Sequence, residues 1–366
     1  MHVVVHIGPY KTGSTAIQAA LRSGQQALEQ QGCYYYHAPL MPEFALQTLG
    51  LSAPEQMVPD LRHRFATLEQ AQAWSARCWQ EFEAQVQARR PLLSLISSEH
   101  FSGLRNPAPL FDRLRRSFSR ITVLAYLRAP ASLYRSTLQQ RIRGNGERLA
   151  DLPSPLSFVY PARQQLEPFL NLVGRDNMVV RRFGRTTQAS QPWDVVADFA
   201  AMLADLEPGL AGPWLQARQQ ANPQADPRAN RSLPGALLAW LLTQNELLDS
   251  RGPGTRRHQL LARLEQDPAL QALPRLAFND PALPALIEAR ARPACAWLNQ
   301  TFLAGQTPLP LAADAPGPET SPQALRAAQE ALRDWLLAQL TPAATQVLAR
   351  ALLTLDPPPR PAPPQE

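Results

Sequence analysis

The 366-residue sequence is almost without lysine and contains few cysteines. Lys11 is its only lysine, and the other 35 of its 36 basic residues are arginine. The three cysteines, Cys33, Cys78 and Cys295, lie too far apart in sequence for the spacing of a cysteine metal site or of a small disulfide-rich domain. We therefore expect buried thiols, no disulfide and a reducing compartment. We also expect the single ammonium group to have a specific task.

Long apolar runs and blocks of like charge are also missing. No apolar run approaches the ~20 residues of a membrane span, and the N-terminus lacks the basic, apolar and cleavage regions of a signal peptide. The net charge is +6, but arginine is mixed with Asp and Glu along the whole chain. This mixture favours a solvated arginine-rich surface over a nucleic-acid partner. The sequence predicts a cytoplasmic protein without a transmembrane segment.

A glycine-containing loop stands out near the N-terminus. Residues 6–15 read His-Ile-Gly-Pro-Tyr-Lys-Thr-Gly-Ser-Thr, after an apolar run and before a helical pattern. This order predicts a strand, a loop and a helix. Gly8, Gly13, Ser14 and Thr15 have the outer spacing of a P-loop, in which backbone amides and a helix N-terminus face an anion. The stretch therefore predicts a P-loop-like anion-binding loop.

The position of the lysine differs from that in an NTPase loop. A Walker loop carries lysine directly after its second glycine, where this chain has Ser14. Here Lys11 lies inside the loop, between Gly8 and Gly13. The sequence therefore predicts an anion site that differs from that of a nucleoside triphosphatase.

Short β-prone runs alternate with helical patterns through the first half of the chain. The predicted strands lie at 3–5, 33–36, 92–97, 121–127 and 178–183. The predicted helices lie at 14–31, 68–86, 111–118, 131–143 and 161–173. This alternation predicts an α/β fold with a doubly wound parallel sheet, in which the second strand returns beside the first. Residues 39–66 lack clear periodicity and are expected to form a lid or an acceptor loop.

The pattern becomes helical beyond Pro192, and proline becomes frequent late in the chain. Further helices are predicted at 193–206, 233–248, 283–302 and 324–353, with linkers near 208–227 and 308–322. We expect an α/β domain over 1–305, consisting of a core (1–206) and a helical cap (207–305). A helical C-terminal extension (306–355) and a disordered proline-rich tail (356–366) are expected to follow.

Polar side chains lie at or just beyond the ends of four predicted strands. They are Lys11, Glu99, His100, Arg128, Arg181 and Arg182. Ligands of open α/β sheets bind at the carboxyl ends of the strands, so these side chains are expected to share one edge of the sheet. This edge is the predicted functional site.

Two segments, 6–18 and 126–136, resemble the sulfotransferase family. Members of that family bind 3'-phosphoadenosine-5'-phosphosulfate (PAPS) on a modified P-loop with the lysine placed as it is here. In the second segment Ser136 lies eight residues after Arg128, which resembles the part of the family that binds the 3'-phosphate. A guanidinium fork and a serine hydroxyl suit a phosphate group. The resemblance implies that PAPS is bound by Gly8, Lys11, Thr12, Gly13, Ser14, Thr15, Arg128 and Ser136.

The resemblance also implies an activity. A sulfuryl group would pass from PAPS to a hydroxyl or amine of a carbohydrate, glycolipid or small-molecule acceptor, by in-line attack on sulfur. Lys11 is expected to oppose the charge that grows on the leaving 5'-phosphate, without a metal ion. Glu99 or His100 is expected to take the proton of the acceptor. The choice between these two stays open, and His37 is the next candidate for the base.

Three further interpretations stay open at this point. A P-loop nucleotide kinase or NTPase would use Glu99 as a partner for Mg²⁺. The others are a nucleotide-binding protein without catalysis and an arginine-rich nucleic-acid-binding protein, which strong binding of 3',5'-ADP without transfer to any acceptor would support. Residues 230–233, Asn-Arg-Ser-Leu, resemble a segment of bacterial sulfotransferase-like chains, but capping of a helix also explains Asn230 or Ser232.

Overall fold

The computed structural model describes residues 1–184, 193–208, 210, 232–247, 256–311 and 320–353. The chain divides into two compact units. The first consists of Met1–Ala129, Tyr160–Ala225 and Pro293–Leu311, and the second of Pro130–Val159, Asp226–Arg292 and Ala312–Glu366. The predicted domain boundaries at 206 and 305 stay a prediction, and the predicted tail at 356–366 lies outside the described residues.

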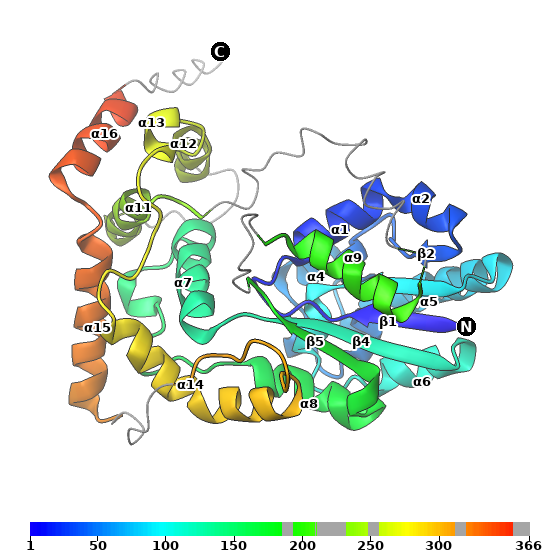
Figure 1. The fold of residues 1–366 in the computed structure, drawn as a ribbon. Coiled ribbons are helices and arrows are strands. Elements are labelled where there is room, and N and C mark those ends of the chain that lie inside the picture. The colour runs from blue at the N-terminus through cyan, green and yellow to red at the C-terminus, as the bar shows by residue number, and fades with distance from the viewer. Residues whose placement is uncertain (185–192, 209, 211–231, 248–255, 312–319, 354–366) are drawn as a thin grey trace, which may run out of the picture. The chain divides into compact units, whose positions relative to one another are not determined.

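The first unit is built on a parallel sheet of five strands in the order β2-β3-β1-β4-β5 (Figure 1). The strands are β1 (His2–His6), β2 (Cys33–Tyr35), β3 (Leu93–Ser97), β4 (Arg120–Leu127) and β5 (Met178–Arg182). All four pairings are parallel, which confirms the predicted α/β class.

The expectation that the second strand lies beside the first was wrong, because β3 lies between them. Strand length gives the physical reason. β3 pairs with β1 along five residues, from His2↔Leu93 to His6↔Ser97, whereas β2 has only three residues. The longer strand takes the interior position, where both of its edges are hydrogen-bonded, and the short strand takes the edge.

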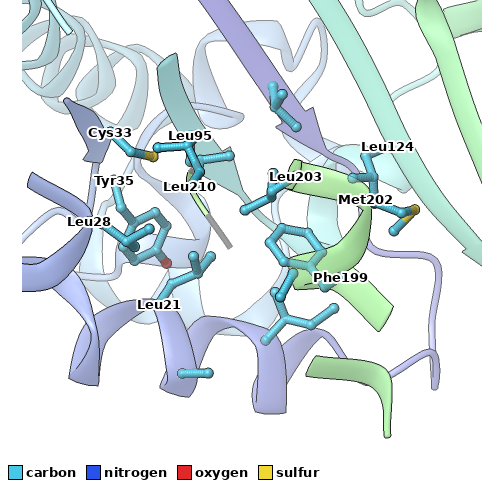
Figure 2. Packing of buried hydrophobic residues seen from close by; sticks show 14 of the residues in the cluster. Leu21, Leu28, Cys33, Tyr35, Leu95, Leu124, Phe199, Met202, Leu203 and Leu210 are labelled. Atoms are coloured by element: carbon cyan, nitrogen blue, oxygen red, sulfur yellow. The ribbon is translucent and has the colours of Figure 1, made fainter. Parts of the chain in front are cut away.

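One face of the sheet is covered by α1 (Ser14–Ser23), α2 (Gln25–Gln30) and α9 (Val195–Leu206). In Figure 2, Leu21 of α1 and Phe199 of α9 point into the apolar layer beneath the strands. The predicted single helix 14–31 is interrupted at Gly24, whose amide donates to the carbonyl oxygens of Ala20 and Arg22. Glycine is a poor helix former, so the chain ends one helix there and begins another.

The opposite face carries α5 (Leu68–Arg89), α6 (Ala108–Ser117) and α8 (Ala162–Val173). Neighbouring residues of β2 show the two faces. Tyr35 belongs to the layer under α1 and α9, while Tyr34 stacks on Phe82 of α5 with ring centres 6.3 Å apart. Helices therefore cover both faces of the sheet, which explains why its strands are apolar in sequence.

Residues 39–66, which have no clear periodicity, form short helical segments. They are α3 (Pro42–Ala45), η1 (Thr48–Gly50), η2 (Pro54–Gln56) and α4 (Pro59–Arg64). Two short 3₁₀ turns also lie in this unit, η3 (Glu99–Gly103) directly after β3 and η6 (Arg175–Asn177) directly before β5. Elements this short show no helical period in sequence, which explains why the sequence did not predict them.

The second unit is helical. Its elements are α7 (Pro130–Gln140), a π-helical turn η4 (Arg141–Asn145), η5 (Leu149–Asp151), α11 (Gly235–Leu247), α12 (Arg256–Leu264), α13 (Pro268–Gln271), α15 (Pro322–Leu337) and α16 (Pro342–Leu353). Helix α14 (Ala282–Thr301) belongs partly to each unit. The helix predicted at 324–353 is two helices, because Pro342 has no amide hydrogen and begins a new helix instead of continuing α15.

Candidate functional site

The loop between β1 and α1 has an unusual backbone. Gly8, Lys11 and Gly13 have φ angles of 45°, 62° and 84°, in the left-handed region. A Cβ on Gly8 would lie 2.5 Å from Ser14 Oγ and 3.0 Å from the Cα of Glu99. A Cβ on Gly13 would lie 2.9 Å from a methyl group of Val195. Glycine is therefore required at both positions, because the loop packs directly against its neighbours.

The hydroxyl groups of the loop differ in their surroundings. Thr12 is buried, and its hydroxyl donates to the carbonyl oxygen of Pro9 within the loop. Ser14 is also buried, with its Oγ beneath Gly8, whereas Thr15 is exposed. The Thr12 hydroxyl thus holds the loop in shape, and Thr15 is the hydroxyl of this group that faces solvent.

The loop ends at the N-terminus of α1, a helix of 10 residues. Gly13 is the N-cap and provides no side-chain hydrogen bond to the first turn. Within the described residues, no oxygen atom accepts a hydrogen bond from the amides of Ser14, Thr15 or Ala16. These donors lie at the positive end of the helix dipole, where an anion is stabilised.

Arg128 follows β4 and lies beside the loop. Its Nη1 donates to the carbonyl oxygen of Lys11 at 2.8 Å, and its guanidinium carbon lies 5.4 Å from the centre of the Phe183 ring. The hydroxyl of Tyr160 donates to the carbonyl oxygen of Arg128 at 2.7 Å. These contacts hold a half-buried guanidinium next to the lysine-bearing turn.

Glu99 and His100 lie in η3, which is tied to β1 and the loop. The amide of Ser98 donates to the His6 carbonyl at 3.1 Å, and the Oγ of Ser98 accepts from the amide of His100 at 3.0 Å. His100 Nε2 lies 3.9 Å from Glu99 Oε1, with the two side chains 16% and 39% exposed. Partial desolvation, and after it the nearby charge of Glu99, raise the pKa of Tyr10, a loop residue that is 44% exposed.

The first unit thus brings together the loop, Glu99, His100 and Arg128 at the carboxyl edge of the sheet. Ser136 lies on α7 and belongs to the second unit. Asn230 and Arg231 lie outside the described residues. His37 follows the edge strand β2 and stacks on Tyr35 with ring centres 6.1 Å apart.

The two arginines at the end of β5 have structural partners. Arg181 forms ion pairs with Asp198 at 3.4 Å and with Asp205 at 2.8 Å. Arg182 donates to the carbonyl oxygen of Pro308 at 2.8 Å. These contacts link β5 to α9 and to the segment after α14, so both arginines stabilise the fold.

Sequence reasoning did not identify His6, the last residue of β1. Its side chain is fully buried, and Nδ1 lies 2.8 Å from Ser97 Oγ. The ring packs edge-on against Phe199 at 5.5 Å, and Nε2 has no hydrogen-bond partner in the described part of the chain. Burial lowers the pKa of His6 from 6.5 to about 3. Its place at the end of an otherwise apolar run was the signal for a buried histidine.

This buried histidine predicts a pH dependence of stability. Because its pKa is lower in the folded protein, the unfolded chain binds the proton more tightly. The free energy of unfolding should therefore fall by up to about 1.4 kcal/mol per pH unit as pH decreases from 6.5 toward 3. Denaturant unfolding between pH 7 and 5 measures this slope. His6→Gln should make the slope shallower, and exposed His63→Gln should leave it unchanged; equal slopes for all three proteins would contradict the prediction.

Comparisons with protein-family models, with curated proteins and with solved structures returned no match to this chain. Within the described residues, no helix is long and apolar enough to cross a membrane. The same residues contain no group of three or more His, Cys, Asp or Glu side chains that could hold a metal ion.

Proposed function

We propose that this protein is a PAPS-dependent sulfotransferase. The observation that carries the proposal is the loop between β1 and α1, in which the only lysine of the chain has a left-handed backbone and is held by Arg128. The predicted P-loop-like role of this loop is part of the proposal. The resemblance of residues 6–18 and 126–136 to sulfotransferases supports it.

The position of the loop in the sheet supports a ligand site. β1 has β3 on one side and β4 on the other. The helix that follows β1 packs on one face of the sheet, and α6, which follows β3, packs on the opposite face. The connections that leave β1 and its neighbour β3 therefore run to opposite faces of the sheet. Open α/β sheets bind their ligands at such a position, outside the carboxyl ends of the strands.

The residues present suit a nucleotide with two phosphate positions. The free amides at the start of α1 and the Lys11 ammonium would hold the 5'-phosphosulfate. The guanidinium of Arg128 would bind the 3'-phosphate, and the predicted contribution of Ser136 stays a prediction. Glycine at positions 8 and 13 lets the loop keep its left-handed backbone while it packs against Ser14, Glu99 and Val195, next to the N-terminus of α1.

The proposed reaction is sulfuryl transfer. The acceptor oxygen forms a bond to sulfur, and the bond between sulfur and the bridging oxygen breaks. That electron pair stays on the 5'-phosphate, which leaves as 3',5'-ADP, and the acceptor proton passes to Glu99 or His100. Lys11 opposes the negative charge that develops on the bridging oxygen. The acceptor is a hydroxyl or amine of a carbohydrate, glycolipid or small molecule.

The role of Arg128 gives the test of this proposal. The unmodified protein should bind 3',5'-ADP much more tightly than 5'-AMP, because only the former offers a 3'-phosphate to the guanidinium. Arg128→Glu should remove this preference, and isothermal titration of both ligands measures it. Because Arg128 also donates to the Lys11 carbonyl, a distorted loop would weaken both ligands, whereas a lost 3'-phosphate contact changes their ratio.

A matched control makes the same charge change elsewhere. Arg22 is exposed near the end of α1, and Arg22→Glu should keep the ratio of the two affinities. Equal affinity of the unmodified protein for 3',5'-ADP and 5'-AMP would overturn the assignment.

A further inference from the structure

A buried phenylalanine stacks on one of the two candidate bases. The rings of Phe44 and His100 have centres 4.2 Å apart and an angle of 26° between their planes. Phe44 is 3% exposed and lies on α3, in the segment for which the sequence showed no periodicity. This contact connects residues 42–51 to the proposed site.

Helix α5 holds α3 and the residues that follow it through three hydrogen bonds, two of them buried. Ser75 Oγ donates to the Ala45 carbonyl at 2.6 Å and accepts from the Leu49 amide at 3.1 Å. The indole Nε1 of Trp79 donates to the Leu46 carbonyl at 3.0 Å. The backbone on the C-terminal side of Phe44 is therefore anchored to a long core helix, and the Phe44 ring has a fixed position.

His100 is constrained from three directions. Phe44 covers one face of its ring, the Oγ of Ser98 accepts from its amide, and Glu99 Oε1 lies 3.9 Å from its Nε2. An imidazole stacked on a fixed ring loses rotamer freedom, so its nitrogen stays directed toward the carboxylate.

We propose that Phe44 is a positioning residue, which holds the imidazole of His100 in the orientation that faces Glu99. The inference rests on the proposed function, because it assigns Phe44 to the proton-accepting pair of that reaction. Phe44 acts through His100 and does not itself touch the reacting atoms. It follows that the segment carrying Phe44 helps to set the rate of proton removal from the acceptor.

The kinetic experiment uses three variants. Phe44→Leu keeps an apolar side chain but removes the stacked ring, and it should lower kcat about 10- to 100-fold while the KM for PAPS stays within twofold. Phe44→Tyr keeps an aromatic ring and should restore kcat to within about threefold of the original value. Phe111→Leu is the control for lost core packing, because Phe111 is fully buried and contacts Phe169 instead. It should lower the melting temperature and leave kcat unchanged.

A spectroscopic experiment separates this inference from the proposed function. In protein labelled at histidine, the Hε1 signal of His100, assigned with His100→Gln, should carry the ring-current shift of Phe44. The shift should be lost in Phe44→Leu and kept in Phe44→Tyr. A signal that does not move in Phe44→Leu would overturn the inference, and so would an unchanged kcat in that variant. If the signal moves but the protein neither binds 3',5'-ADP nor turns over PAPS, the proposed function fails while the positioning of His100 stands.

Discussion

Lys11→Arg is expected to lower kcat about 10²–10³-fold, although it keeps the charge and matches the arginine-rich composition of the chain. An ammonium is a compact point charge on a flexible stem and can follow the bridging oxygen as charge develops there. A guanidinium is a wider planar fork. Only four residues separate Gly8 from Gly13, so the fork would crowd the phosphosulfate or point past it. Losing one well-directed donor to a developing oxyanion costs about 2.7–4 kcal/mol.

Nucleotide affinity should fall much less in Lys11→Arg. The amides at the start of α1 remain, and Arg128 binds the carbonyl of residue 11, which the substitution retains. Steady-state kinetics and titration with 3',5'-ADP separate the two effects. The exposed Arg22→Lys makes an exchange of the same two residue types on α1 and should change neither value. Turnover of Lys11→Arg at the original rate would show that Lys11 supplies only positive charge.

Glu99→Gln and His100→Ala are expected to identify the proton acceptor. Replacing the residue that acts as the base should lower kcat about 10²–10⁴-fold. PAPS binding should stay largely intact, because the base contacts the acceptor and not the nucleotide. The backbone of Glu99 lies against Gly8, and its side chain is 39% exposed, so it is accessible to an acceptor. His100 is more buried and stacks on Phe44.

Two exposed residues provide the controls for this pair. Glu81→Gln and His63→Ala make similar changes at exposed positions on α5 and α4, and both should keep full activity. Circular dichroism and melting temperature establish that each variant folds. If Glu99→Gln and His100→Ala both retain full kcat, the base lies elsewhere, and His37 is the next residue to change.

The strands could be predicted because each is a short apolar run, and a sheet covered on both faces requires such runs. Their order could not be predicted, since the insertion of β3 between β1 and β2 depends on pairing between residues about 90 positions apart, such as Val4 and Leu95. The breaks at Gly24 and Pro342 were visible in the sequence as poor helix formers. The apolar period continues across both, and this led to the prediction of single helices.

The candidate site, like the fold, could be predicted only in part. The loop, Glu99 and Arg128 could be placed together because parallel strands bring their carboxyl ends to one edge. The direction of the side chains could not be predicted: the Thr12 hydroxyl turns into the loop, and Ser14 lies beneath Gly8. Phe44 was missed because a four-residue helix has no period, and its contact with His100 exists only in three dimensions.

The central claim is that the loop binds a nucleotide that carries a 3'-phosphate. Its most direct test compares the melting temperature of the unmodified protein with 3',5'-ADP, ADP and ATP, each with and without Mg²⁺. The proposal predicts the largest increase with 3',5'-ADP, independent of Mg²⁺, and a ligand at ~100 times its Kd should stabilise by about 2.7 kcal/mol. A larger increase with ADP or ATP in the presence of Mg²⁺ would contradict it and favour a nucleotide kinase or NTPase.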